Sequence, residues 1–326
     1  TIQLTCTTHP VKNSYLTIAN GVKYTLTEDD LKAFASDSTY GKQLNGNSVI
    51  FTNGDLHIHA VCGESCTHNG AHSNAVWKPL TYNAETKTLY YGGTAASKES
   101  KGFYKLPAGN YYLTGDVTLT ENEAWKPADG VVLCLNGKSI QASGNFDVIT
   151  VNNGVTFTLC DCKGGKDAYG QITHATGKTG SGVYVSGNGR FYMYGGSISN
   201  NTTNLGDNGG GVYMAGGQFT MYGGSITKNT AKKDSQNNGG NGGGVYVNSG
   251  TFDMNGNASV SDNTATKNGG GVYVGGGTFT MNDTASVKDN TASDNTADQG
   301  NGGGVYVYSG TFEMNGSASV SSNKAT

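Results

Sequence analysis

The C-terminal half of the chain repeats one Gly-rich phrase five times. Each copy contains the letters GVY, then a Phe, a Met two residues after the Phe, an Ile or Val, and a closing Asn. The copies begin at Gly182, Gly211, Gly244, Gly271 and Gly304, so successive copies are separated by 29, 33, 27 and 33 residues. Self-similarity at such a period is typical of a solenoid, in which each unit packs on its neighbours.

Each copy holds three short apolar segments with a period of two, such as VYV and FTM. This period is typical of β-strands, and the Gly-Gly, Asn-Gly and Ser-Gly pairs between the segments are turn signals. The 52 glycines of the chain supply the backbone freedom that so many bends require. Three short strands with a bend after each predict one coil of a parallel β-helix, with successive coils about 4.8 Å apart. The predicted fold class is therefore all-β.

The pleat of the predicted strands assigns an inward and an outward face. Val183 and Val185 are expected to point inward and Tyr184 outward. The closing Asn residues are expected to form an internal ladder, in which each amide bonds to the next coil at a tight corner. These residues are Asn201, Asn229, Asn263, Asn290 and Asn323.

The outward tyrosines are the first candidate binding site. They recur once per coil and are expected to form one exposed ladder of stacked rings: Tyr184, Tyr213, Tyr246, Tyr273 and Tyr306. Tyrosine is enriched at binding surfaces, and flat aromatic rows suit sugar rings. The alternative interpretation is that the rings only stabilise the sheet by stacking across strands.

The repeat pattern GGGVYV–GTFTM–GGSIS–NTA resembles the right-handed parallel β-helix repeats of bacterial surface adhesins. It is similar to the repeats of chlamydial-type polymorphic outer-membrane proteins, and more similar to large cell-wall proteins of gut Firmicutes. The match is clear over residues 177–326 and looser back to about 105. The resemblance implies a right-handed β-helix and an extracellular, bacterial cell-surface location, as a segment of a longer chain.

The domain organisation follows from the extent of this pattern. We expect an N-terminal β-rich module over residues 1–104 and the parallel β-helix over 105–326, with regular repeats from about 177. The upstream segments GNYYLTGDVTLT, GVVLCLNGKSI and GVTFTLCDC are interpreted as earlier, less regular coils.

The stretch HIHAVCGESCTHNGAH is a candidate metal site. Its potential ligands are His57, His59, Cys62, Cys66, His68 and His72. Imidazole and thiolate are the ligands that Zn²⁺ prefers, so the cluster predicts a structural zinc site. The alternative is a disulfide between Cys62 and Cys66, or one with Cys6, beside exposed histidines.

Two weaker features are also noted. Asp289, Asp294 and Asp298 share one loop and are a weak candidate for Ca²⁺, although their spacing is not that of an EF-hand. Cys134 and Cys160 are 26 residues apart, one coil, so they are expected to stack, either joined in a disulfide or as buried reduced cysteines.

Charge and hydropathy restrict the functional classes. With 21 basic and 24 acidic residues the net charge is −3, which does not favour nucleic acid as a partner. No apolar run is long enough to span a membrane. We expect a non-enzymatic, adhesin-like binding protein for a host glycan, mucin or host protein. The alternatives are an immunoglobulin-binding, superantigen-like surface protein, a pure spacer, and a polysaccharide-degrading enzyme of pectin-lyase-like fold. The enzyme would need clustered outward carboxylates, which the repeats do not contain.

Overall fold

The computed structural model describes residues 77–98, 104–120, 124–161, 169–294 and 300–326, and the backbone of five short strands before residue 52. Every regular element within these residues is a β-strand, and no helix among them could cross a membrane. The chain divides into two compact units, Thr1–Trp77 and Lys78–Thr326. The boundary predicted at residue 104 lies inside the second unit.

The first unit contains short antiparallel pairs. Strand β5 lies between β1 and β4, and β2 pairs with β3. The strands are β1 (Ile2–Thr5), β2 (Tyr15–Thr17), β3 (Lys23–Thr25), β4 (Lys42–Asn45) and β5 (Ser48–Phe51).

Antiparallel strands also precede the repeats. β7 pairs with both β6 and β8, and β9 pairs with β10. Their bounds are β6 (Trp77–Asn83), β7 (Thr88–Tyr91), β8 (Thr94–Ala95), β9 (Ser97–Lys98) and β10 (Tyr104–Lys105).

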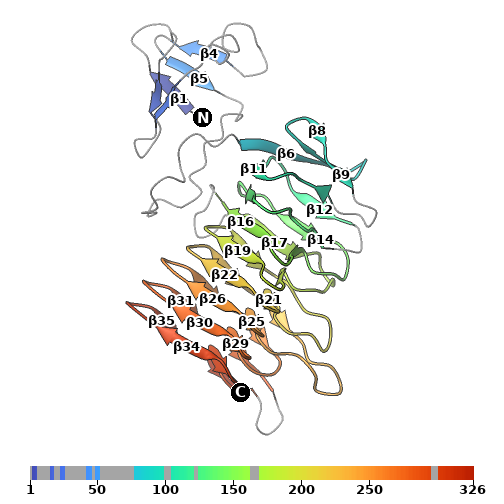
Figure 1. Ribbon diagram of the computed structural model, residues 1–326, viewed down its shortest axis with the longest axis vertical. Coiled ribbons are helices and arrows are strands. Elements are labelled where there is room, and N and C mark those ends of the chain that lie inside the picture. The colour runs from blue at the N-terminus through green and yellow to red at the C-terminus, as the bar shows by residue number, and fades with distance from the viewer. Residues whose placement is uncertain are drawn as a thin grey trace. The chain divides into compact units, whose positions relative to one another are not determined.

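From β11 onwards the strands stack in parallel, coil upon coil, an arrangement consistent with a parallel β-helix (Figure 1). One stack, here the Phe–Met sheet, consists of β11 (Gly109–Leu113), β13 (Val131–Cys134), β16 (Thr156–Cys160), β19 (Arg190–Met193), β22 (Gln218–Met221), β26 (Thr251–Met254), β30 (Thr278–Met281) and β34 (Thr311–Met314). The Tyr sheet consists of β15 (Ile149–Val151), β18 (Val183–Val185), β21 (Val212–Met214), β25 (Val245–Val247), β29 (Val272–Val274) and β33 (Val305–Val307).

Two further stacks complete the coils. The Ser sheet consists of β12 (Val117–Leu119), β14 (Ile140–Ala142), β17 (Gln171–His174), β20 (Ser197–Ser199), β23 (Ser225–Thr227), β27 (Ser259–Ser261), β31 (Ser286–Lys288) and β35 (Ser319–Ser321). A short corner sheet consists of β24 (Thr230–Ala231), β28 (Thr264–Ala265), β32 (Thr291–Ala292) and β36 (Lys324–Ala325). The sequence predicts three strands per coil, and the corner sheet adds a fourth. Its two-residue strands are too short to show a period of two.

The repeats stack in register although their lengths differ. Val245 pairs with Val272, and Phe252 pairs with Phe279. Register is preserved because the extra residues of the longer copies lie in one place, between the corner strand and the next Gly-Gly-Gly. That corner is crowded: a Cβ on Gly244 would lie 2.6 Å from the carbonyl oxygen of Gly271, so a side chain does not fit there.

The predicted inward and outward faces are confirmed. Val183 and Val185 are fully buried, whereas Tyr184 between them is partly exposed. In the same way, Phe252 and Met254 are fully buried, whereas Asp253 is partly exposed. The inward phenylalanines form a continuous stack with ring centroids 4.7–5.7 Å apart, running through Phe157, Phe191, Phe219, Phe252, Phe279 and Phe312. A shared core of identical rings therefore joins the coils.

The internal Asn ladder is also confirmed. Asn201, Asn229, Asn263 and Asn290 are fully buried. Each donates from its backbone N–H and its side-chain Nδ2 to the Oδ1 of the next coil's Asn, at 2.9–3.0 Å. The ladder thus has one direction, and this direction fixes the orientation of every amide in it.

Candidate functional site

The five predicted tyrosines form a continuous stack on the outward face of the Tyr sheet. Neighbouring ring centroids are 4.9–5.3 Å apart, and the rings are close to parallel. The rings are half-buried, and Tyr273 is only 8% exposed, so the ladder is less exposed than the sequence predicts. The reason is that each ring covers the face of the next.

Burial changes the acidity of the ladder. It raises the pKa of Tyr213 and of Tyr246 above the ordinary value for a phenol. It raises the pKa of Tyr273 to about 12, with a further contribution from the neighbouring tyrosines. Tyr213, Tyr246 and Tyr273 therefore keep their protons at physiological pH. Because the rings stack face to face, the ladder offers ring edges and hydroxyl groups to a partner rather than ring faces.

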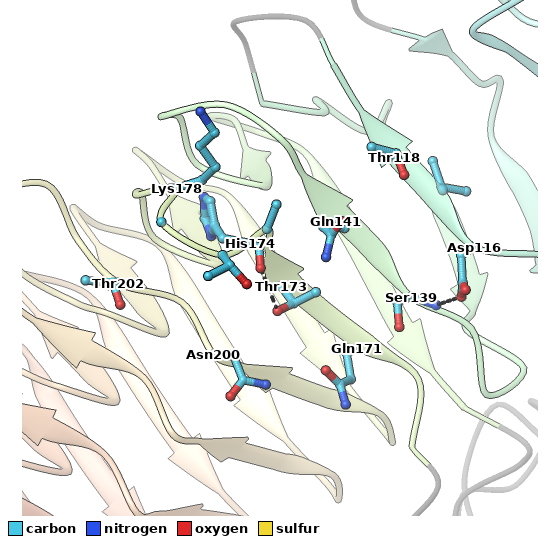
Figure 2. Close-up of a pocket in the computed structure, with 14 residues that line it drawn as sticks. Asp116, Thr118, Ser139, Gln141, Gln171, Thr173, His174, Lys178, Asn200 and Thr202 are labelled. Atoms are coloured by element: carbon cyan, nitrogen blue, oxygen red, sulfur yellow. Dashed lines mark hydrogen bonds between the residues drawn. The ribbon is translucent and has the colours of Figure 1, made fainter. Parts of the chain in front are cut away.

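The structure contains a second candidate site that the repeats do not predict. A groove of about 600 Å³ lies on the outward side of the early Ser sheet, over β12, β14 and β17 (Figure 2). Most of its lining side chains carry a hydroxyl or an amide: Thr118, Ser139, Gln141, Gln171, Thr173, Thr176, Asn200 and Thr202. Besides His174, its ionisable lining residues are Asp116 and Lys178, which lie at opposite ends of the groove in Figure 2.

Strand register explains why these side chains come together. Thr118 pairs with Gln141, and Gln141 pairs with Thr173, so the three form one outward row across consecutive coils. A second row is formed by Asp116, Ser139 and Gln171, one position before the inward Val or Ile of each strand. The Asp116 carboxylate accepts a hydrogen bond of 2.8 Å from the Ser139 N–H, which anchors that end.

Two glutamines line the groove with uncommitted side-chain amides. Neither the Gln141 nor the Gln171 side chain forms a hydrogen bond to another residue in the part of the chain that the structure describes. A primary amide presents two donors and an acceptor. The pair can therefore bind a ligand that has both hydroxyl donors and hydroxyl or ether acceptors.

The sequence contained a signal for this groove. In the regular coils the row of Gln171 continues as Ser197, Ser225, Ser259 and Ser286. A glutamine in a row of serines is a departure from the repeat. This difference is not apparent from the sequence alone, because the early coils lack the GVY letters by which the copies are aligned.

The predicted metal ligands lie partly outside the described residues. His57, His59, Cys62, Cys66, His68 and His72 lie outside the described residues, so the zinc site stays a prediction. Asp298 of the predicted calcium loop also lies outside them, and the Asp294 carboxylate is 2.7 Å from the Lys233 ammonium group. Within the described residues no group of three or more His, Cys, Asp or Glu could hold a metal ion.

The stacked cysteines lie where the coil length predicts. Cys134 and Cys160 pair in register on β13 and β16 and are buried. Both are thiols in the structure, which corresponds to the interpretation as buried reduced cysteines.

Because the comparisons with known proteins found no match, a functional proposal for this chain depends on its sequence pattern and its geometry. No protein-family model, no curated protein and no solved structure matches the chain.

Proposed function

We propose that the chain is a non-enzymatic, adhesin-like binding protein, built on a right-handed parallel β-helix, that binds a host glycan in the groove over β12, β14 and β17. The observation that carries this proposal is the lining of the groove. It combines a volume of about 600 Å³, within the usual range of ligand sites, with uncommitted amides on Gln141 and Gln171. We place the protein outside the cell, at a bacterial surface.

The spacing of the polar rows favours a saccharide. Equivalent side chains on parallel strands recur about every 4.8 Å, a distance close to the length of one sugar unit. A row of amides and hydroxyls at that interval can meet the hydroxyls of successive sugars. Sites that hydrogen-bond hydroxyl groups also discriminate strongly against ligands that lack them, because their own polar groups would then remain unpaired.

The carboxylate arrangement favours binding over hydrolysis. Glycoside hydrolysis ordinarily uses two carboxyl groups that flank the scissile bond. Among the described residues that line the groove there is a single carboxylate, that of Asp116, and this group accepts a hydrogen bond from the Ser139 N–H. The lining therefore lends no support to a polysaccharide-degrading enzyme.

A host protein such as immunoglobulin, or mucin, is the second candidate partner, and the tyrosine ladder is the observation that favours it. Five stacked rings present a continuous row of hydroxyl groups across five coils. Tyrosine is enriched at protein interfaces for this combination of apolar area and polar edge.

A glycan array and an immunoglobulin pull-down on the full chain separate these candidates. We expect glycan binding, and we expect the double variant Gln141→Ala/Gln171→Ala to lose it. The matched control Ser225→Ala changes the same outward row in a regular coil and should retain binding. Immunoglobulin capture that survives the double variant but not Tyr246→Ser would favour the second candidate. Silence in both assays would reject the proposal.

A further inference from the structure

Among the described lining residues, His174 is a buried ionisable group that the proposed function does not use. It is the last residue of β17, it lines the groove, and its side chain is buried, with 6% of the residue exposed. Its Nδ1 lies 2.7 Å from Oδ1 of Asn201, and its Nε2 lies 2.8 Å from the carbonyl oxygen of Phe146. Both ring nitrogens thus face an oxygen at hydrogen-bond distance.

The orientation of the Asn201 amide is fixed by the Asn ladder. Its Nδ2 lies 2.9 Å from Oδ1 of Asn229 and 3.1 Å from the carbonyl oxygens of Ile172 and Ser199. If the amide were reversed, its oxygen would face these three oxygens, and all of these hydrogen bonds would be lost. The atom that faces His174 is therefore the oxygen, which only accepts.

The second hydrogen-bond partner of the ring is also an atom that can only accept. A backbone carbonyl oxygen such as that of Phe146 accepts hydrogen bonds and cannot donate one. A neutral imidazole has one N–H and one lone pair, so it would satisfy one oxygen and direct its lone pair at the other. Only the doubly protonated ring donates to both.

From this geometry we infer that His174 is held as an imidazolium cation, which caps the open end of the Asn ladder and forms a pH-sensitive latch between coils. In the coil of His174, Ala175 occupies the position of the ladder Asn, so Asn201 has no Asn in the preceding coil to donate to its oxygen. The histidine supplies that missing donor. The inference does not depend on what the groove binds.

Nearby charges act on the ring from several elements. Asp147 directly follows Phe146, and it accepts a 2.8 Å hydrogen bond from the Ser181 N–H. Burial raises the pKa of Asp147, and the nearby negative charge of Asp207 raises it further. The hydrogen bond from Ser181 and the positive charge of His174 lower it. Lys178 and Asp116 also line the groove, at its opposite ends (Figure 2). An anionic Asp147 favours the cationic ring, and the burial of the ring opposes it.

Nitrogen-detected NMR of the full chain tests the protonation state directly. At pH 7.5 an unperturbed imidazole is about nine-tenths neutral. We expect both ring nitrogens of His174 to show the protonated signature at that pH. The variant Asp147→Asn keeps an oxygen for the Ser181 N–H and removes the charge, so the protonated fraction should fall. A neutral ring with a single N–H at pH 7.5 would overturn the inference.

The pH dependence of stability is a second, independent test. His174→Gln keeps an N–H donor for Asn201 but carries no charge. The stability difference between the wild type and this variant should be largest below about pH 6.5, where an imidazole is protonated in both the folded and the unfolded chain. It should decrease as the pH rises and the folded ring loses its proton. A difference that is independent of pH between 5 and 9 would contradict the latch.

Discussion

The regular coils, from Val183 onwards, and the earlier coils share the aliphatic inward residues of the Ser sheet but differ on its outward face. Inside the Ser sheet Ile140, Ile172 and Ile198 stack in register across the boundary between the two regions. Outside it, the serine row of the regular coils gives way to Gln171 before Ile172 and to Asp116 before Val117, with Ser139 between them. An inward residue must fit the coils on both sides, whereas an outward one must fit only solvent or a ligand. Surface divergence therefore collects where the groove lies.

The largest effect is expected from breaking the shared core. Phe252→Ala removes a fully buried ring that stacks 4.9 Å from Phe219 and 4.8 Å from Phe279. We expect a loss of about 3–5 kcal/mol in the free energy of unfolding, measured by chemical denaturation. Thr251→Ala, at an exposed position of the same strand, is the control and should cost little. A loss below about 1 kcal/mol for Phe252→Ala would contradict the claim that a shared core joins the coils.

The Asn ladder should give the next largest effect. The Asn263 amide donates to the Ile226 carbonyl and to Asn290, and its oxygen accepts from Asn229. Asn263→Ala leaves buried polar groups unpaired, so we expect a loss of about 2–3 kcal/mol in the free energy of unfolding. The exposed Asn257→Ala is the matched control. Equal stabilities of the two variants would show that the ladder is dispensable.

The groove predicts that substitutions in the earlier coils and in the regular coils affect glycan affinity differently. Gln171→Ala should weaken glycan binding by about tenfold, because one or two hydrogen bonds to the ligand are lost. Ser225→Ala, in the same row of a regular coil, should leave the affinity unchanged. Titration calorimetry with a glycan identified on the array measures both. Comparable losses in the two variants would place the binding surface along the whole Ser sheet.

The smallest effect concerns the tyrosine ladder at alkaline pH. The pKa of Tyr273 is about 12 in the folded protein, against about 10 for an unperturbed phenol. Between these values the unfolded chain releases the proton and the folded one retains it, so stability is intact below pH 10 and falls as the pH rises towards 12. Ultraviolet absorbance titration should show late-ionising tyrosine, and Tyr273→Phe should remove part of it. If every tyrosine ionised near pH 10, the stack would not be buried in solution.

Much of the fold could be predicted from residues that repeat. The inward Phe252 and Met254 and the closing Asn263 follow from a period of two and from the recurrence of one Asn per copy. Two further Asn ladders were missed, namely Asn208, Asn241, Asn268 and Asn301 before the Gly-Gly-Gly corners, and Asn255, Asn282 and Asn315 after the Met. Both recur at fixed positions in the printed sequence. Their partners lie one coil away, so the pattern becomes hydrogen bonding only once the register is known.

The candidate site was much less predictable than the fold. The tyrosine ladder is visible because it repeats, but the burial of Tyr273 depends on how closely the rings stack. The groove combines residues from three early coils with Asn200 and Thr202 of the first regular coil, and Asp116 and Lys178 are 62 positions apart in the chain. Nothing in the local sequence of Gln141 or Gln171 indicates that their side chains would line one groove.

The repeats alone predict a stack of short strands with an aromatic core and an Asn-lined corner. They do so because each coil makes the same contacts as the next, and repeated contacts require repeated residues. The polar groove over the early coils, and the buried histidine between two oxygens, became visible only in the three-dimensional structure. Those features arise where the repeat departs from itself. The contacts of such a non-repeating residue depend on neighbours that lie far away in sequence and one coil away in space.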